Sequence, residues 1–185
     1  IILEPAYDLY RPAIMHAGGV PVGVNLAFEQ DKFVVDWTRV KSAVTSKTRA
    51  IIVNTPNNPT GVVYSEETIE KMAEILEKKQ KEFGTDIYLI SDEPYRELAY
   101  DGVEVPYLTK YYANTIVGYS YSKSLSLPGE RIGYLVIPSE ASDSEDLISA
   151  ASVATRILGF VNAPTLQQKV VARCLHEKTD ISYYN

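Results

Sequence analysis

The chain is poor in several features that define whole classes of protein. Its 185 residues include a single cysteine, so no disulfide can form within it and we expect a reducing compartment. No apolar run approaches the roughly 20 residues of a membrane-spanning helix. No basic segment followed by an apolar stretch opens the chain, so no signal peptide is visible. We therefore expect a cytoplasmic protein that makes no contact with a membrane.

An excess of positive charge is also missing. The chain carries 18 lysines and arginines against 24 acidic residues, which gives a net charge of -6 at pH 7. This balance argues against nucleic acid as a partner, because proteins that bind nucleic acid present basic surfaces. No internal repeat and no Pro- or Gly-rich linker divides the sequence. We expect residues 1–185 to form a single domain.

Both ends lack the marks of natural termini. The chain begins without methionine, directly in an apolar run, and stops at Tyr183, Tyr184 and Asn185 without a helix stop or a tail. We therefore expect it to be one domain of a longer protein, with further segments on both sides.

Short apolar runs alternate with helical patterns along the chain. The runs are nearly continuous, as expected of strands covered on both faces, and span residues 1–3, 20–24, 50–53, 87–90, 115–119 and 134–137. Asp36 and Ser65 are predicted N-caps of two helices, the second of which ends at Gly84 and carries one apolar stripe of Ile69, Met72, Ile75 and Leu76. Further helices are predicted from about 144 to 158 and from about 164 to 175. This alternation predicts an α/β fold with a mostly parallel sheet.

Polar, turn-forming clusters follow four of the predicted strands, at residues 4–7, 54–61, 91–95 and 120–123. In open α/β sheets ligands bind beyond the carboxyl ends of the strands, so we expect one shared site at this edge. The alternative is that four loops simply have the composition of loops.

Two charged residues in these clusters suggest chemistry. Lys123 lies between serines after a predicted strand, and a lysine becomes a nucleophile towards aldehydes when burial or nearby cations lower its pKa. Arg131, eight residues further on, could hold an anion beside it. Asp92 ends a strand expected to be buried, where a carboxylate needs a partner such as a protonated ring nitrogen. A solvated loop lysine and a turn or cap aspartate are the ordinary alternatives.

Three further side chains could face the same ligand. Tyr95 follows Asp92 by three residues, Asn58 lies in a stiff turn between prolines, and Tyr7 could stack on a planar ring. Packed aromatic rings and a simple turn would explain them equally well.

As a set, these segments closely resemble the class I/II pyridoxal-phosphate-dependent aminotransferases, the aspartate aminotransferase family. The matching stretches are Asn57–Gly61, Ser91–Tyr95, Ser120–Lys123 and Arg131–Tyr134, in the order and strand context of that family. The resemblance extends over essentially the whole chain. It implies the three-layer αβα large domain of fold type I enzymes, with pyridoxal 5′-phosphate as cofactor and no metal.

The resemblance also implies a role for each candidate residue. Lys123 would bond the cofactor and then move a proton between the substrate α-carbon and the cofactor C4′ carbon. Asp92 would keep the pyridine nitrogen protonated. The remaining contacts would be to the ring oxygen from Asn58 and Tyr95, to the ring face from Tyr7, and to the phosphate from Ser120 and Arg131, with Ser122 as a weaker candidate.

The implied activity is amino-group transfer between an amino acid and a 2-oxo acid, in a homodimer. Two alternatives stay open: a carbon–sulfur lyase on the same fold, or the ligand-sensing domain of a transcription regulator. The intact Asn58–Gly61 motif favours transamination. Because the family's N-terminal arm, its small domain and its arginine for the substrate carboxylate are expected outside this sequence, we expect the isolated chain to have little or no turnover.

Overall fold

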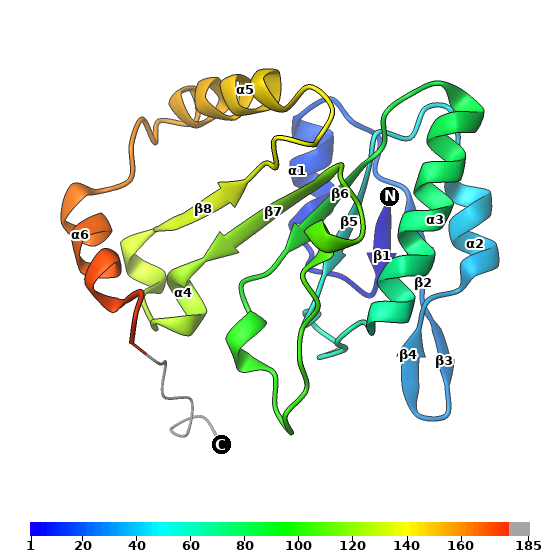
Figure 1. Ribbon diagram of the computed structural model, residues 1–185, viewed down its shortest axis with the longest axis horizontal. Coiled ribbons are helices and arrows are strands. Elements are labelled where there is room, and N and C mark those ends of the chain that lie inside the picture. Colours follow the sequence, from blue (N-terminus) through cyan, green and yellow to red (C-terminus); the bar gives the residue numbers. More distant parts are fainter. Residues whose placement is uncertain (178–185) are drawn as a thin grey trace.

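A six-stranded sheet forms the centre of the computed structural model, which describes residues 1–177 (Figure 1). Its strands are β1 (Ile2–Glu4), β2 (Gly23–Asn25), β5 (Ala50–Asn54), β6 (Tyr88–Asp92), β7 (Thr115–Ser120) and β8 (Gly133–Val136). The strand order is β2-β1-β5-β6-β7-β8. All neighbouring pairs are parallel except β7 and β8, which are antiparallel. The mostly parallel sheet predicted from the sequence is therefore confirmed.

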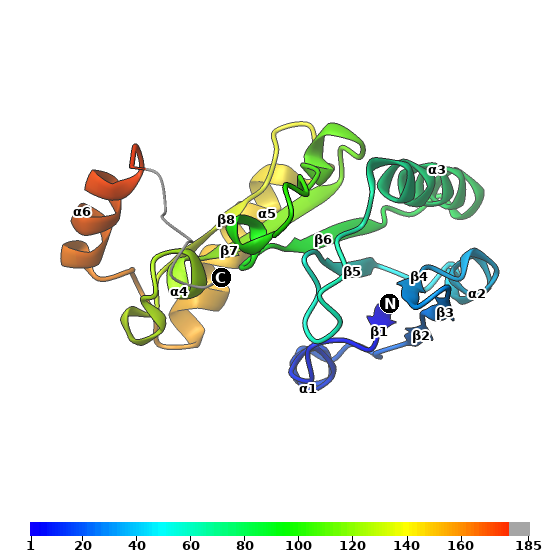
Figure 2. The ribbon, with the colours of Figure 1, turned by 90° about the horizontal axis from the view of Figure 1, so that it is seen from below.

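Helices lie on both sides of this sheet. Figure 2 shows α2 (Trp37–Ala43) and α3 (Glu66–Phe83) on one side and α1 (Tyr10–His16) on the other. Helices α5 (Ser144–Ile157) and α6 (Thr165–Cys174) follow β8. The shorter elements are α4 (Tyr121–Ser124) and the 3₁₀ helices η1 (Arg96–Leu98), η2 (Leu108–Lys110) and η3 (Pro128–Glu130). Within residues 1–177, no helix combines the length and apolar character that crossing a bilayer requires.

The two predicted N-caps are confirmed. Asp36 accepts hydrogen bonds from two backbone N–H groups in the first turn of α2, at 3.0 and 3.1 Å. Ser65 accepts one in the first turn of α3, at 3.3 Å. Gly84 ends α3 with φ at 63°, a left-handed conformation that costs glycine little because it has no Cβ. Each cap satisfies backbone groups that a helix end leaves without a partner.

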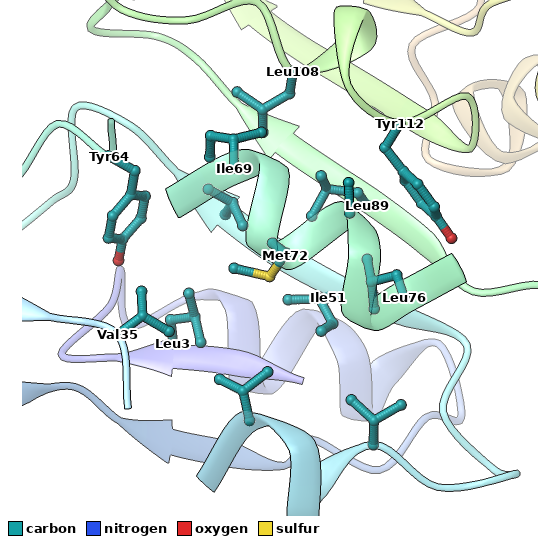
Figure 3. Packing of buried hydrophobic residues seen from close by; sticks show 14 of the residues in the cluster. Leu3, Val35, Ile51, Tyr64, Ile69, Met72, Leu76, Leu89, Leu108 and Tyr112 are labelled. Carbon is teal, nitrogen blue, oxygen red and sulfur yellow. The ribbon is translucent and has the colours of Figure 1, made fainter. Parts of the chain in front are cut away.

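Helix α3 buries its predicted apolar stripe, of which Ile69, Met72 and Leu76 pack against the sheet and α2 (Figure 3). Burying one large aliphatic side chain contributes about 1.5–3 kcal/mol to the free energy of folding. The packed set includes Leu3, Val40, Ile51, Val53, Ile69, Met72, Leu76, Leu89 and Leu108. This core packs against β1, β5 and β6. It therefore holds in place the strands whose carboxyl ends carry polar residues.

Two buried tyrosines beside this core allow the contribution of a buried hydroxyl group to stability to be measured (Figure 3). The Tyr112 hydroxyl donates to the Ile87 carbonyl at 2.6 Å. The Tyr64 hydroxyl has no hydrogen-bond partner within the described part of the chain, and burial raises its pKa to about 12. We expect Tyr112→Phe to lower the free energy of unfolding by about 1 kcal/mol, and Tyr64→Phe to leave it unchanged or raise it. Urea unfolding measures both, and equal losses would show that Tyr64 is paired as well.

Three features of the fold differ from the sequence predictions or were not predicted. Helix α1 begins without a side-chain cap, and Pro12 in its first turn reads as a breaker. The hairpin of β3 (Ala27–Glu29) and β4 (Lys32–Val34) turns through Gln30 and Asp31 at φ of 50° and 61°, without the glycine that usually marks such turns. The strand expected at residues 20–24 begins only at Gly23, which pairs with Ile2, the first residue of β1.

Strand β8 also corrects the expectation that every strand is covered on both faces. All four of its residues are exposed in the structure of residues 1–177. It is the edge strand of the sheet, and an apolar groove that includes Leu135 and Ile148 separates it from α5. An apolar run in the sequence predicts a strand, but it does not predict which elements cover the faces of that strand.

Candidate active site

The carboxyl ends of β5, β6 and β7 meet at one edge of the sheet, as the sequence predicted. The strand register pairs Asn54 with Asp92, and Asp92 with Gly118. Ser120 ends β7 two residues further on, and the short helix α4 begins directly after it. Residues far apart in the sequence are therefore neighbours here.

Asp92 lies at the end of β6 and is partly buried. The hydroxyl of Tyr10, the first residue of α1, donates a hydrogen bond to Asp92 Oδ2. Burial raises the pKa of Asp92, the Tyr10 hydrogen bond lowers it, and the adjacent Glu93 raises it. Burial and the contact with Asp92 raise the pKa of Tyr10 far above its usual value. Tyr10 thus keeps its proton and acts as a donor to the carboxylate.

Asn54 connects Asp92 to the turn that carries Asn58. Its side-chain amide donates to the Asp92 backbone carbonyl at 2.8 Å, and its Oδ1 accepts from the Asn58 backbone N–H at 2.6 Å. The Asn58 side chain in turn donates to the Tyr95 hydroxyl at 3.4 Å. Sequence reasoning missed Asn54. Its signal was a polar residue at the end of a buried strand, where only 4% of it is exposed.

The neighbours of Asn58 shape the turn. Asn57 Oδ1 accepts hydrogen bonds from the backbone N–H and the hydroxyl of Thr60, at 3.2 and 2.9 Å. The Gly61 N–H donates to the Asn57 carbonyl at 2.7 Å, and Gly61 has φ at 71°. A side chain at Gly61 would be strained at that φ. Asn57, Thr60 and Gly61 therefore stabilise the turn, and the turn positions the Asn58 side chain.

Lys123 lies in α4, one residue beyond Ser122. Its Nζ is 5.5 Å from the centroid of the Tyr95 ring, and the residue is exposed among residues 1–177. Ser120 caps this helix, because its Oγ accepts from the Ser122 N–H at 3.2 Å and donates to the Ser122 Oγ at 2.8 Å. The two serine hydroxyls are thus held together within three residues of the lysine.

Tyr7 and Arg131 complete the predicted set. The Tyr7 ring is 40% exposed and meets the Tyr10 ring edge-on, with 5.6 Å between the centroids. Gly133 pairs with Ser120 in the β7–β8 ladder, which returns the Arg131 backbone to the end of β7. The Arg131 guanidinium donates to a backbone carbonyl of η3 at 2.8 Å. Among the described contacts, none joins that guanidinium to either serine.

Comparison with known proteins identifies the family of the chain. The profile of the family described as aminotransferase class I and II matches residues 1–184, so the chain belongs to this family. It is 47% identical to an amino transferase from Eubacterium rectale whose crystal structure superposes with a TM-score of 0.92, over 99% of this chain and 46% of that one.

Two further relatives are aminotransferases by name. The chain is 40% identical over 138 residues to a probable aspartate/prephenate aminotransferase of Thermus aquaticus. The aligned region covers 75% of this chain and 34% of that protein. It is 37% identical over 154 residues to an aspartate aminotransferase of Bacillus subtilis, which covers 81% of this chain and 36% of that protein. The chain thus spans between 34% and 46% of the length of these three relatives.

Proposed function

We propose that the complete protein containing this chain transfers an amino group between an amino acid and a 2-oxo acid, with pyridoxal 5′-phosphate bound beyond β5, β6 and β7. One observation carries the proposal: contacts between neighbours connect Asp92, Asn58, Tyr95 and Lys123 at a single sheet edge. Membership of the aminotransferase family supports it.

The side chains at this edge fit the chemical groups of the cofactor. The Asp92 carboxylate suits a protonated ring nitrogen, and Asn58 and Tyr95 offer an amide and a phenol for the ring oxygen. The exposed Tyr7 ring suits stacking on a planar ring. When bound, pyridoxal phosphate supplies an electron sink for the bond that breaks at the substrate α-carbon.

Lys123 has two tasks in this proposal. Its amine would hold the cofactor through the aldehyde group of pyridoxal phosphate. The same amine would also move a proton between the substrate α-carbon and the C4′ carbon, which would be acid–base catalysis by a positioned group. Proton delivery by Lys123 to C4′, and not back to the α-carbon, would make the result a transfer of the amino group.

Ser120, Ser122 and Arg131 are proposed to hold the phosphate. Both hydroxyls lie at the end of β7, and within residues 1–177 the Arg131 guanidinium has a neutral carbonyl as its described partner. A guanidinium binds a phosphate through charged, two-pronged hydrogen bonds, which are stronger than its bond to a carbonyl. Arg131 would therefore exchange partners when the phosphate binds.

The proposal extends to the whole protein. We propose that this chain is the single cofactor-binding large domain of a cytoplasmic homodimer, as the family resemblance implies. The intact Asn58–Gly61 turn and the names of the relatives favour amino-group transfer over a carbon–sulfur lyase or a ligand-sensing domain.

Borohydride trapping tests the function directly. Borohydride makes the bond between a lysine amine and an aldehyde permanent. After the complete protein is loaded with pyridoxal phosphate, reduced and digested, the added mass should lie on the peptide with Lys123. A parallel assay should show new amino acid formed from a 2-oxo acid. Label on another lysine, or only pyruvate and thiol from cystathionine, would contradict the proposal.

A further inference from the structure

The contact between Tyr10 and Asp92 has no part in the functions proposed so far. We infer that Tyr10 is a positioning residue, whose hydroxyl orients the Asp92 carboxylate and keeps it charged for the ring nitrogen of the cofactor. This inference rests on the proposed function, because it concerns the same site. It adds a residue that neither the motifs nor the strand ends indicated.

Within residues 1–177, one of the two Asp92 carboxylate oxygens has a described hydrogen-bond partner and the other has none. Tyr10 reaches Oδ2 from α1, 82 residues away in the sequence and attached to a different element. Among the contacts of residues 1–177, Oδ1 accepts no hydrogen bond, so it is the atom left to meet a ligand. A carboxylate held at one oxygen has lost its rotational freedom before the ligand arrives, which lowers the entropic cost of binding.

Apart from Tyr10, the surroundings of Asp92 disfavour the charged form of its carboxyl group. Burial and the neighbouring Glu93 both raise the pKa of Asp92, and the Tyr10 hydrogen bond is the one described influence that lowers it. The Tyr7 and Tyr95 hydroxyls act on Tyr10 electrostatically and make its loss of a proton still less favourable. Tyr10 therefore remains a donor, and its removal should raise the pKa of Asp92 further, because a donor to a carboxylate favours the charged form.

A purely structural Tyr10 would pack its ring and nothing more. The ring does contact Tyr7, at 5.6 Å between centroids. Phenylalanine at position 10 keeps this packing and removes only the hydroxyl. The two roles therefore predict different results for Tyr10→Phe.

The test uses the complete protein and two measurements. The first is the pKa of Asp92 in the cofactor-free protein, followed by ¹³C NMR of its carboxyl carbon. The second is the dissociation constant of pyridoxal phosphate from an absorbance titration. We expect Tyr10→Phe to raise the pKa of Asp92 and to weaken cofactor binding about tenfold, the size expected for one hydrogen bond to a charged group.

Tyr112→Phe is the matched control. It also removes a buried hydroxyl that donates to an oxygen, but this one contacts the Ile87 carbonyl within the core. We expect it to change neither the pKa of Asp92 nor the dissociation constant. A change of equal size in both variants would mean that a general loss of stability, and not the contact with Asp92, causes the effect, and the inference would be overturned.

A second variant decides the question if Tyr10→Phe fails to fold. Incorporation of 3-fluorotyrosine at position 10 keeps the ring and the hydroxyl but makes the hydroxyl a stronger donor. The pKa of Asp92 should then fall below its value in the unmodified protein. An unchanged pKa would overturn the inference.

The outcomes for Tyr10 and for the proposed function are separable. If borohydride places the cofactor on Lys123 while Tyr10→Phe leaves both measurements unchanged, the function stands and the role of Tyr10 is rejected. If borohydride labels a different lysine, the proposed function fails. The titration of Asp92 without cofactor still reports the contact itself.

Discussion

Replacement of Lys123 by alanine should abolish amino-group transfer in the complete protein. We expect kcat to fall by at least about 10²–10⁴-fold, the contribution of a positioned acid–base group, with a further loss because the cofactor is no longer bonded. The absorbance band that borohydride removes from the unmodified protein should be missing. Alanine is a strong helix former, so α4 should persist and the cause of the loss should be chemical.

Lys47→Ala provides the control for this prediction. Lys47 is also exposed, but it lies in the loop before β5, at the opposite end of the strand from Asn54. Its replacement should leave both the rate and the absorbance band unchanged. A Lys123→Ala protein that kept the same reducible band would show that another residue bonds the cofactor.

Among the proposed substitutions, the one that removes the Glu93 charge should lower the free energy of unfolding the most. Glu93 is 3% exposed and its Oε2 pairs with Arg96, at 2.6 Å from Nη2 and 2.8 Å from Nε. Its Oε1 accepts from the Ser91 hydroxyl at 2.6 Å. Glu93→Gln would leave the Arg96 guanidinium without its counter-charge, so we expect the free energy of unfolding to fall by about 3 kcal/mol.

The contacts of Arg96 explain why the loss of stability in Glu93→Gln should extend to the segment around residues 105–107. Its guanidinium also donates to the carbonyls of Val105 and Pro106, at 2.5 and 2.9 Å, and lies 4.1 Å from the centroid of the Tyr107 ring. The pair thus ties the segment around residues 105–107 to the end of β6. Hydrogen exchange in that segment should accelerate together with the loss of stability.

The matched control is Glu82→Gln in the pair that Glu82 forms with Lys79 at 2.9 Å. The Glu82 side chain is 48% exposed, against 4% for Glu93, so water screens its charge. We expect this variant to cost less than about 1 kcal/mol in urea unfolding. If both glutamine variants lost the same small amount, burial would not strengthen the Glu93–Arg96 pair.

The parts of the fold that could be predicted have signals that are local in the sequence. Helix α3 carries its cap, its apolar stripe and its terminal glycine within 20 residues, from Ser65 to Gly84. The polar residues at the strand ends were recognised because a parallel sheet gathers its carboxyl ends at one edge. The same principle predicts that Lys123 and Asp92 lie at one edge of the sheet.

The parts that could not be predicted depend on contacts between distant segments. Tyr10 and Asp92 are 82 residues apart, and Asn54 reaches the Asp92 carbonyl over 38 residues. Nothing in the residues around Tyr10 distinguishes it from an ordinary helical tyrosine. Likewise, the exposure of β8 is set by what packs on it, which its apolar sequence does not contain.

The buried amide of Asn54 has a mechanical consequence. One side chain forms hydrogen bonds with both the Asp92 backbone and the Asn58 backbone, so it links the positions of these two residues. A substitution that shifts one of the two backbones should therefore disturb its hydrogen bond to Asn54 and, through it, the other. Variants designed to alter this site should therefore keep residues 54, 58 and 92, and vary segments that this amide does not contact.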